Sequence, residues 1–198
     1  MKIYDISQDV LSSEIYPGDP YPKLGTLSSI AKGDTYNLSE FSMCAHNGTH
    51  VDAPSHFIKD GKTVGELELS KMIGPCFVAT VCGNIGTDEV HALVFSARSE
   101  NPEAAKRILI RGNGVIFPQG AEALRKEGVV LIGTESQSVG PVDSPMQVHK
   151  ILLEGDTVLL EGIRLSEVSD GVHFLFAAPL NLGAAEGAPC RAVIVDFY

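Results

Sequence analysis

Short apolar runs rich in β-branched residues recur along the chain, and most are bounded by glycine, proline or aspartate. Runs of this kind predict β-strands, and those that are apolar throughout are typical of strands at the centre of a sheet. The first run is followed by the turn-rich segment 16–22, "YPGDPYP". The predicted strands lie at 2–7, 74–83, 107–112, 129–134, 156–162 and 190–198.

Four other segments have the spacing of apolar residues that predicts helices. They lie at 64–72, 87–97, 118–128 and 145–155. The third starts with Pro118 and ends at Gly128, which are common residues at the start and end of a helix. Because strands and helices alternate through the middle, while the first third and the end are strand-rich, we expect a mixed α/β fold with more sheet than helix.

The composition supports one folded domain over residues 1–198. The 198 residues are 44% hydrophobic and 20% charged, which is enough apolar material for a sizeable core. No signal-peptide pattern opens the chain, and no apolar run approaches the roughly 20 residues needed to cross a bilayer. We therefore expect a cytoplasmic protein that does not act in the membrane.

The net charge limits the partners. With 15 basic and 25 acidic residues the formal charge is -10, and nucleic acid phosphates select basic surfaces instead. Nucleic acid is thus excluded as an expected partner, whereas small molecules and other proteins remain.

The segment "HNGTHVDAPSH" at 46–56 carries the most distinctive chemistry. Side chains alternate faces in an extended segment, so potential ligands separated by even numbers of residues can share one face. Gly48 and Pro54 make the segment a poor helix, and we expect a strand that passes into a loop. Mixed nitrogen and oxygen ligands suit zinc, manganese or iron better than calcium. The predicted face consists of His46, His50, Asp52 and His56.

Two further potential ligands lie far downstream. His149 falls in a predicted helix and Glu161 at the end of a predicted strand. Their positions alone do not identify them as metal ligands, because His149 could lie on a solvated helix face and Glu161 could simply end its strand. The metalloprotease motif HExxH is excluded, since Asn47 stands where that mechanism needs glutamate.

The sequence resembles a known family at this motif. "HNGTHVDAPSHF" is similar to the signature HxGTHxDxPxHF of the cyclase-like metal-dependent hydrolases, which include bacterial kynurenine formamidase and isatin hydrolase. The similarity covers nearly the whole chain. It continues through "YDIS", "YPGDP", "ILIRG", "LIGTESQSVGP", "HKILLEGDTVLLEGI" and "APLNLGAAEGAPCRAVIV".

The resemblance implies a swivelling β/β/α fold with two divalent metal ions per subunit, Zn²⁺ being favoured and Mn²⁺ the alternative. It assigns the first ion to His46, His50 and Asp52. Asp52 would bridge to the second ion, held also by His149 and Glu161. His56 would move protons beside the metals, and relatives commonly form dimers or larger assemblies, so we expect a homodimer or homotetramer.

The pocket residues are less well defined. Tyr16, in an aromatic-bearing turn, and Phe57, directly after the motif, are candidates for substrate binding, although Tyr16 could belong to a surface turn and Phe57 to the core. The family pattern after "GTES" is close to "SxDP", but the chain has "SQSVGPVDSP", which leaves the wall near Ser138 and Asp143 undefined. His91 is expected on the surface and His173 in a strand near the core.

The expected activity is hydrolysis of an amide or formamide C–N bond by metal-activated water. Hydrolysis of N-formylkynurenine to kynurenine and formate is the leading hypothesis. The alternatives are a hydrolase of cyclic amides such as isatin or of other amides or esters, a ring-closing cyclase, and a metal-binding relative without catalysis.

Overall fold

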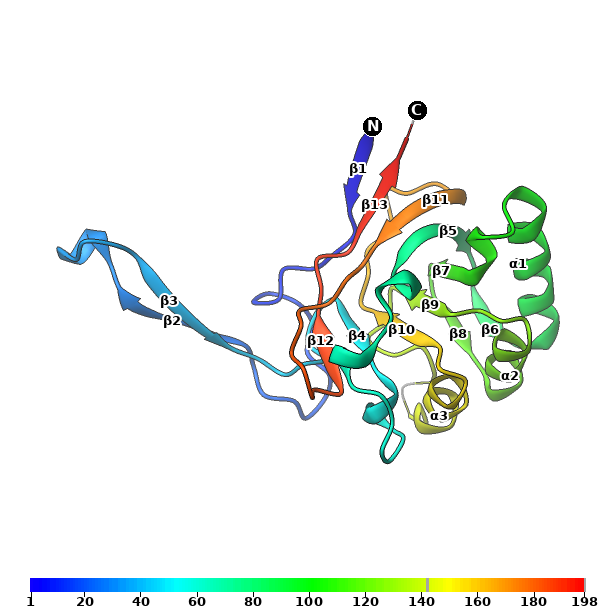
Figure 1. Cartoon of the computed structure of the whole chain (residues 1–198), viewed down its shortest axis with the longest axis horizontal. Helices are drawn as coiled ribbons and strands as arrows, with labels where there is room; N and C mark the ends of the chain where they lie inside the picture. Colours follow the sequence, from blue (N-terminus) through cyan, green and yellow to red (C-terminus); the bar gives the residue numbers. More distant parts are fainter. Residues whose placement is uncertain (142, 198) are drawn as a thin grey trace.

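A nine-stranded mixed sheet forms the centre of the computed structural model, which describes residues 1–141 and 143–197 (Figure 1). Residue 198, at the end of the last predicted strand, therefore lies outside the described residues. In spatial order the sheet contains β1 (Lys2–Asp5), β13 (Val193–Asp196), β11 (Gly171–Phe176), β5 (Ile73–Thr80), β7 (Arg107–Arg111), β9 (Leu131–Thr134), β10 (Val158–Glu161), β4 (His50–Asp52) and β12 (Gly187–Pro189).

The middle of the sheet is parallel and its borders are antiparallel. The neighbours β5, β7, β9 and β10 run parallel to one another, whereas β4 and β12 continue the sheet in antiparallel pairs. Two small ribbons complete the strands: β2 (Lys23–Ser28) with β3 (Leu38–Ser42), and β6 (Gly83–Ile85) with β8 (Gly114–Ile116).

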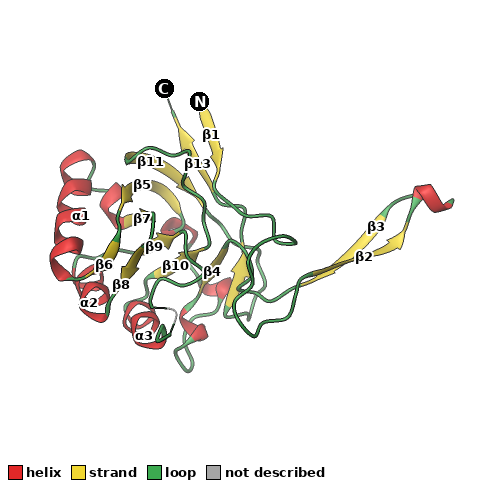
Figure 2. Ribbon diagram, turned by 180° about the vertical axis from the view of Figure 1, so that it is seen from behind, coloured by secondary structure: helices red, strands yellow, loops and turns green. Residues whose placement is uncertain are grey.

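Three α-helices cover one face of the sheet (Figures 1 and 2). They are α1 (Thr87–Glu100), α2 (Pro118–Lys126) and α3 (Met146–Glu154). Single turns of 3-10 helix occur at η1 (Ile30–Lys32), η2 (Pro54–His56), η3 (Val64–Glu66), η4 (Leu69–Lys71) and η5 (Ala104–Lys106). Within the described ranges, no helix is long and apolar enough to span a membrane.

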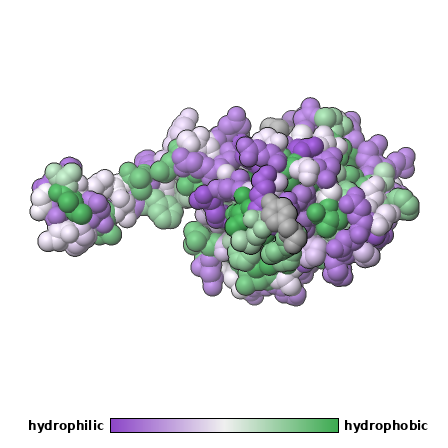
Figure 3. All heavy atoms as spheres, turned by 90° about the horizontal axis from the view of Figure 1, so that it is seen from above, coloured by the Kyte–Doolittle hydropathy of each residue, from purple (hydrophilic) through white to green (hydrophobic). Residues whose placement is uncertain are grey.

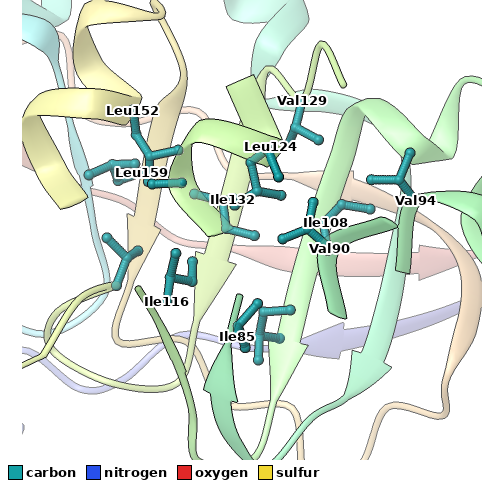
Figure 4. Packing of buried hydrophobic residues seen from close by; sticks show 14 of the residues in the cluster. Ile85, Val90, Val94, Ile108, Ile116, Leu124, Val129, Ile132, Leu152 and Leu159 are labelled. Carbon is teal, nitrogen blue, oxygen red and sulfur yellow. The ribbon is translucent and has the colours of Figure 1, made fainter. Parts of the chain in front are cut away.

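Apolar side chains fill both faces of the central strands. Along β7, Ile108 and Ile110 pack in the cluster beneath the helices, whereas Leu109 belongs to the cluster on the opposite face. This alternation follows from the two-residue period of a strand and explains why the parallel strands are apolar throughout. Figure 4 shows the helix-side cluster, where Ile108 and Ile132 of the sheet lie among residues of α1 and α2.

The predicted α/β class, strands and three of the four helices are confirmed. The helix predicted at 64–72 is wrong, because this segment forms η3 and η4 separately. The backbone N–H groups of Val64 and Gly65 donate to the carbonyls of Ala185 and Gly183, so the segment docks on a neighbouring loop. An added Cβ on Gly65 would lie 2.9 Å from the Gly183 oxygen, which shows how closely the two backbones approach.

The β2–β3 ribbon projects from the body as a long arm (Figures 1 and 2). The two strands are antiparallel, with Leu24 opposite Phe41. None of residues 23–42, all of which the structure describes, is buried. The arm therefore has no part in the core of its own chain.

Gly120 should be required for the packing of α2 on β6. A Cβ at this position would lie 2.3 Å from the backbone oxygen of Ile85, so Gly120→Ala must displace the helix or the strand. We expect the free energy of unfolding to fall by about 1–3 kcal/mol, although alanine is the better helix former. Urea denaturation measures the change, with Gln119→Ala as the control. Equal or greater stability of Gly120→Ala would contradict this packing.

Candidate metal centre

The strand β4 places the centre of the site between β10 and β12. His50 and Asp52 are two residues apart on β4, so their side chains share a face. Glu161, the last residue of β10, lies directly opposite His50 in the antiparallel register. The His50 Nε2 atom is consequently 3.4 Å from a carboxylate oxygen of Glu161 and 3.3 Å from Asp52 Oδ1.

His46 and His56 reach the same site from outside the strand. The expectation that all four residues share one extended face is wrong, because the strand spans only His50–Asp52. Gly48, at φ +67, allows a turn that places His46 Nδ1 2.8 Å from Asp52 Oδ1. Pro54 begins the turn η2, which carries His56 back so that its ring stacks on that of His46, with centroids 4.0 Å apart.

His149 completes the site from α3. It is only 4% exposed, which rules out the solvated helix face that its sequence position left open. Its Nε2 atom lies 3.2 Å from Glu161 Oε1 and 3.8 Å from Asp52 Oδ2. His149 and Glu161 thus lie beside the residues of the segment 46–56, a position that sequence spacing alone did not predict.

The potential ligand atoms form overlapping groups, in each of which they lie within 4.8 Å of one another. Asp52 belongs both to the first donor group (His46, His50, Asp52) and to the second donor group (Asp52, His149, Glu161). A third combination joins His46 and His56 to Glu186. Sequence reasoning missed Glu186, which lies in the loop before β12: the segment 178–195 that contains it was part of the resemblance, but its position gave no sign that it meets the histidines.

Backbone groups orient two of the histidines. The Nδ1 atom of His50 lies 3.0 Å from the Gly48 carbonyl oxygen, and that of His149 lies 2.9 Å from the Pro145 carbonyl oxygen. If each Nδ1 donates its hydrogen to the carbonyl, Nε2 is left as a lone-pair ligand facing the centre. Such outer contacts are usual around metal-binding histidines, whose ring orientation they fix.

Charges within the site are strongly coupled. Burial opposes protonation of His50, but Asp52 and Glu161 outweigh it and raise the pKa of His50 to about 10. Burial would raise the pKa of Asp52, yet His46 and His50 hold it well below its usual range. Burial, assisted by the neighbouring histidines His46 and His149, lowers the pKa of His56 even though Asp52 acts in the opposite direction. Opposite charges thus offset one another within the site, with His50 holding its proton beside Asp52 and Glu161.

The residues fit divalent metal ions. Asp52 Oδ2 is buried and has no hydrogen-bond partner among the described residues, which is costly for a carboxylate oxygen. Asp52 and Glu161 place two buried negative charges side by side, and a cation replaces the protons that the histidines otherwise supply. Imidazole nitrogen with carboxylate oxygen is a donor set typical of zinc and manganese.

A cavity of about 420 Å³ is lined by members of both donor groups, His46, His50, His149 and Glu161, and by His56. Tyr16 and Phe57 both line it, as do Gln137 and Ser138 from the atypical stretch after β9. Phe57 also packs against the helix-side core, so it is both a pocket and a core residue. The described lining residues do not include Asp143. The cavity has the size of a small-molecule site.

The remaining histidines lie elsewhere, as expected. His91 is on the exposed side of α1, with Nε2 3.6 Å from Glu127. His173 is in β11, where Nδ1 lies 2.6 Å from Asp196. Neither residue lines the site cavity.

Gly187 should be required for the position of His46. It lies opposite Asp52 in the β12–β4 pair, and an added Cβ would be 2.4 Å from His46 Cε1. Because His56 stacks on the His46 ring, that ring cannot move freely away from the added Cβ. Gly187→Ala should therefore weaken metal binding at the first donor group by about 10- to 100-fold. The second donor group should be preserved.

Metal titration measures whether Gly187→Ala weakens binding at the first donor group and leaves the second unchanged. The control is Gly86→Ala, whose added Cβ meets only the flexible end of Glu89. If Gly187→Ala binds both ions with wild-type affinity, the close contact with His46 does not matter.

The comparisons with known proteins identify the family of the chain. The family described as "Putative cyclase" matches residues 4–141. The kynurenine formamidase of Bacillus cytotoxicus is 35% identical over 96% of this chain and 95% of its own length, and that of Paracidovorax citrulli is 31% identical over 97% and 95%.

Solved structures share the fold. A "potential metal-dependent hydrolase with cyclase activity" superposes with a TM-score of 0.81, at 24% identity, and covers 100% of this chain and 98% of its own. Isatin hydrolase A from Labrenzia aggregata has a TM-score of 0.82 at 18% identity, with coverage of 98% and 93%. The matched segment and the full-length curated relatives show that this chain belongs to the cyclase family.

Proposed function

We propose that this protein is a metal-dependent hydrolase of amide and formamide C–N bonds, with N-formylkynurenine as its substrate. The observation that carries the proposal is Asp52, a buried carboxylate common to two donor groups. The other members of these groups, His46, His50, His149 and Glu161, line a cavity of small-molecule size. The full-length similarity to kynurenine formamidases favours the formamide over other amides.

The ligands would be divided between two positions. His46 and His50 would hold one ion and His149 and Glu161 the other, with Asp52 between them. Divalent ions held in this way lower the pKa of bound water toward neutrality and polarise a carbonyl oxygen. The 3.2 Å contact of Glu161 with His149 and the 2.8 Å hydrogen bond from the Val139 N–H keep that carboxylate in place.

His56 is suited to move a proton at the reacting bond. It lies in the cavity wall, stacked on His46 at 4.0 Å, and its ring faces that of Phe57 edge-on at 4.4 Å. Water supplies hydroxide to the formyl carbon, and the arylamine that leaves must receive a proton. His56 takes the proton from water and delivers it to this nitrogen as the C–N bond breaks.

The aromatic part of the substrate would lie against Tyr16 and Phe57. Both line the cavity, and Phe57 is held between the His56 and His149 rings, with its centroid 4.9 Å from that of His149. A fixed aromatic wall orients a flat aryl group while the polar side of the cavity receives the formamide.

Hydrolysis of N-formylkynurenine before and after chelation tests the proposal. Formate and kynurenine should appear in equal amounts, chelation should abolish their release, and zinc or manganese should restore it. Restored cleavage of isatin without cleavage of the formamide would instead assign the site to cyclic amides. Metal-loaded protein that cleaves neither these substrates nor an activated ester would favour a non-catalytic relative.

Three finer properties belong to the same proposal. Zinc is favoured over manganese as the resident ion, since the donor set is rich in imidazole nitrogen. We expect a cytoplasmic enzyme that works as a homodimer or homotetramer, because symmetric homo-oligomers are common among soluble enzymes.

A further inference from the structure

A second cavity of about 400 Å³, here called the adjoining cavity, lies beside the cavity at the metal centre, here called the site cavity. The two cavities share one wall, because Tyr16, Gln137 and Ser138 line both. Among its described lining residues, the adjoining cavity has none of the potential metal ligands. It therefore offers space next to the site cavity but away from the reacting bond.

The shared wall carries buried polar atoms without partners. Neither Nε2 nor Oε1 of Gln137 has a hydrogen-bond partner among the described residues. The same holds for Oγ of Ser138, a residue that is only 5% exposed. Buried polar groups are normally paired, and an exception requires a reason such as a ligand or a bound water. The amide offers a donor and an acceptor, and the hydroxyl offers either, so both are available to a substrate.

The backbone holds the shared wall in place. The Val139 N–H, directly after Ser138, donates to Glu161 Oε1 at 2.8 Å. The Val139 carbonyl in turn accepts a hydrogen bond from the N–H of Ile116 in β8, at 3.1 Å. Gln137 and Ser138 are thus fixed relative to a potential metal ligand, as residues that orient a substrate must be.

We infer that the substrate occupies both cavities, and that Gln137 and Ser138 donate hydrogen bonds to its ketone at the shared wall. This inference rests on the proposed function and specifies the substrate class: aryl formamides with an acyl side chain next to the formamide.

The shape of N-formylkynurenine fits this arrangement. Its ketone is attached to the ring carbon next to the formamide nitrogen, and the side chain beyond the ketone carries an ammonium and a carboxylate. The formamide lies at the metal centre and the ring against Tyr16 and Phe57. Because Tyr16 lines both cavities and Phe57 only the site cavity, the ketone then meets the shared wall and the side chain enters the adjoining cavity.

The contact acts on the reaction as well as on binding. The ketone withdraws electrons from the ring that carries the leaving nitrogen. A hydrogen bond donated to the ketone oxygen strengthens this withdrawal, and it stabilises the negative charge that develops on the nitrogen as the C–N bond breaks. Because the bond is stronger in the transition state than in the bound substrate, it raises kcat and does not merely lower KM.

Charge in the adjoining cavity suits the ammonium group of the side chain. Its described lining residues include the carboxylates of Glu14 and Glu135 but neither lysine nor arginine. Glu135 already accepts the N–H groups of Gly112 and Leu165, at 2.7 and 2.8 Å, whereas Glu14 is exposed. Hydrophilic residues cover much of the body in Figure 3, and the formal charge of -10 also favours a cationic group. The ammonium is therefore assigned to Glu14.

Three substrates test the ketone contact through kcat and KM. Formanilide has neither ketone nor side chain, ortho-formamidoacetophenone has the ketone alone, and N-formylkynurenine has both. The double variant Gln137→Ala/Ser138→Ala should lower kcat/KM for both ketone substrates by about 5- to 100-fold, the range for two lost hydrogen bonds, and leave formanilide unchanged. The melting temperature should not fall, because the removed atoms have no partner among the described residues. Gln119→Ala, in α2 outside both cavities, is the control.

Glu14→Gln tests the place of the side chain. It keeps the size of the residue and removes the charge, so it should lower kcat/KM for N-formylkynurenine by about 2- to 5-fold, as for a partly exposed ion pair. Cleavage of ortho-formamidoacetophenone, which has no ammonium, should not change. Wild-type kinetics of Glu14→Gln with N-formylkynurenine would overturn the assignment of the side chain to the adjoining cavity.

The results also separate this inference from the proposed function. A double variant that loses activity equally on all three substrates would overturn the ketone contact, because formanilide has no ketone to lose. Unchanged kinetics with the ketone substrates would overturn it as well, since the shared wall would then bind only water. Wild-type protein that cleaves none of the three substrates would refute the proposed function and the inference with it.

Discussion

Replacing Asp52 with asparagine should remove both metal ions and with them the hydrolytic activity. The substitution keeps the shape of the side chain but removes the charge common to both donor groups. Loss of a residue that only hydrogen-bonds to a metal ligand typically lowers metal affinity or activity 10- to 100-fold. We expect the loss of a shared ligand to exceed this range. His46 and His50, each within 3.3 Å of Asp52, also lose their charged partner.

Two measurements distinguish this outcome from simple unfolding. Metal analysis should show little bound metal, and added zinc, which should raise the melting temperature of the wild type, should leave that of Asp52→Asn unchanged. Asp196→Asn is a matched control, because Asp196 also pairs with a histidine, His173, at 2.6 Å but lies outside the site. An Asp52→Asn protein that still binds about two ions would show that this carboxylate is not the shared ligand.

Replacing His56 with alanine should separate catalysis from metal binding. The metal content should stay at the wild-type level, while kcat for N-formylkynurenine should fall by about a hundredfold to ten-thousandfold, as is typical of acid–base residues. The reason is that His56 lies in the cavity wall beside His46 but belongs to neither donor group that contains Asp52.

The geometry also allows a different result. His56 can join His46 and Glu186 in a combination of potential ligands, and His46 Nε2 lies 3.3 Å from Glu186 Oε1. If His56→Ala loses one ion per subunit, this third combination is occupied and His56 is a ligand. His91→Ala, at an exposed histidine of α1, should change neither metal content nor rate.

Sequence reasoning named residues that the structure brings close together, but it did not predict the path of the chain between them. His50 and Asp52 share a face because two-residue spacing on a strand requires it, and this follows from the local pattern alone. His46 and His56 reach the site through a turn at Gly48 and a 3-10 turn at Pro54–His56. The even number of residues between the motif's side chains does not predict these turns. The structure therefore brings the members of the motif together, but not as one extended segment.

Long-range features depended on resemblance or were missed. His149 and Glu161 are more than ninety residues from the motif, and only the register of β10 with β4 and the packing of α3 bring them to it. Glu186 and the arm had no counterpart in the local analysis. An exposed apolar hairpin has the residue pattern of any other strand pair, and its projection from the body is decided by the tertiary structure.

Metal content per subunit, measured on protein purified without added metal and then titrated with zinc or manganese, tests the central claim most directly. The same samples are assayed with N-formylkynurenine. The shared position of Asp52 predicts saturation at about two ions per subunit, with hydrolysis that rises as they bind and disappears on chelation. Protein that binds neither zinc nor manganese, or that hydrolyses the substrate equally well after complete chelation, would contradict the account.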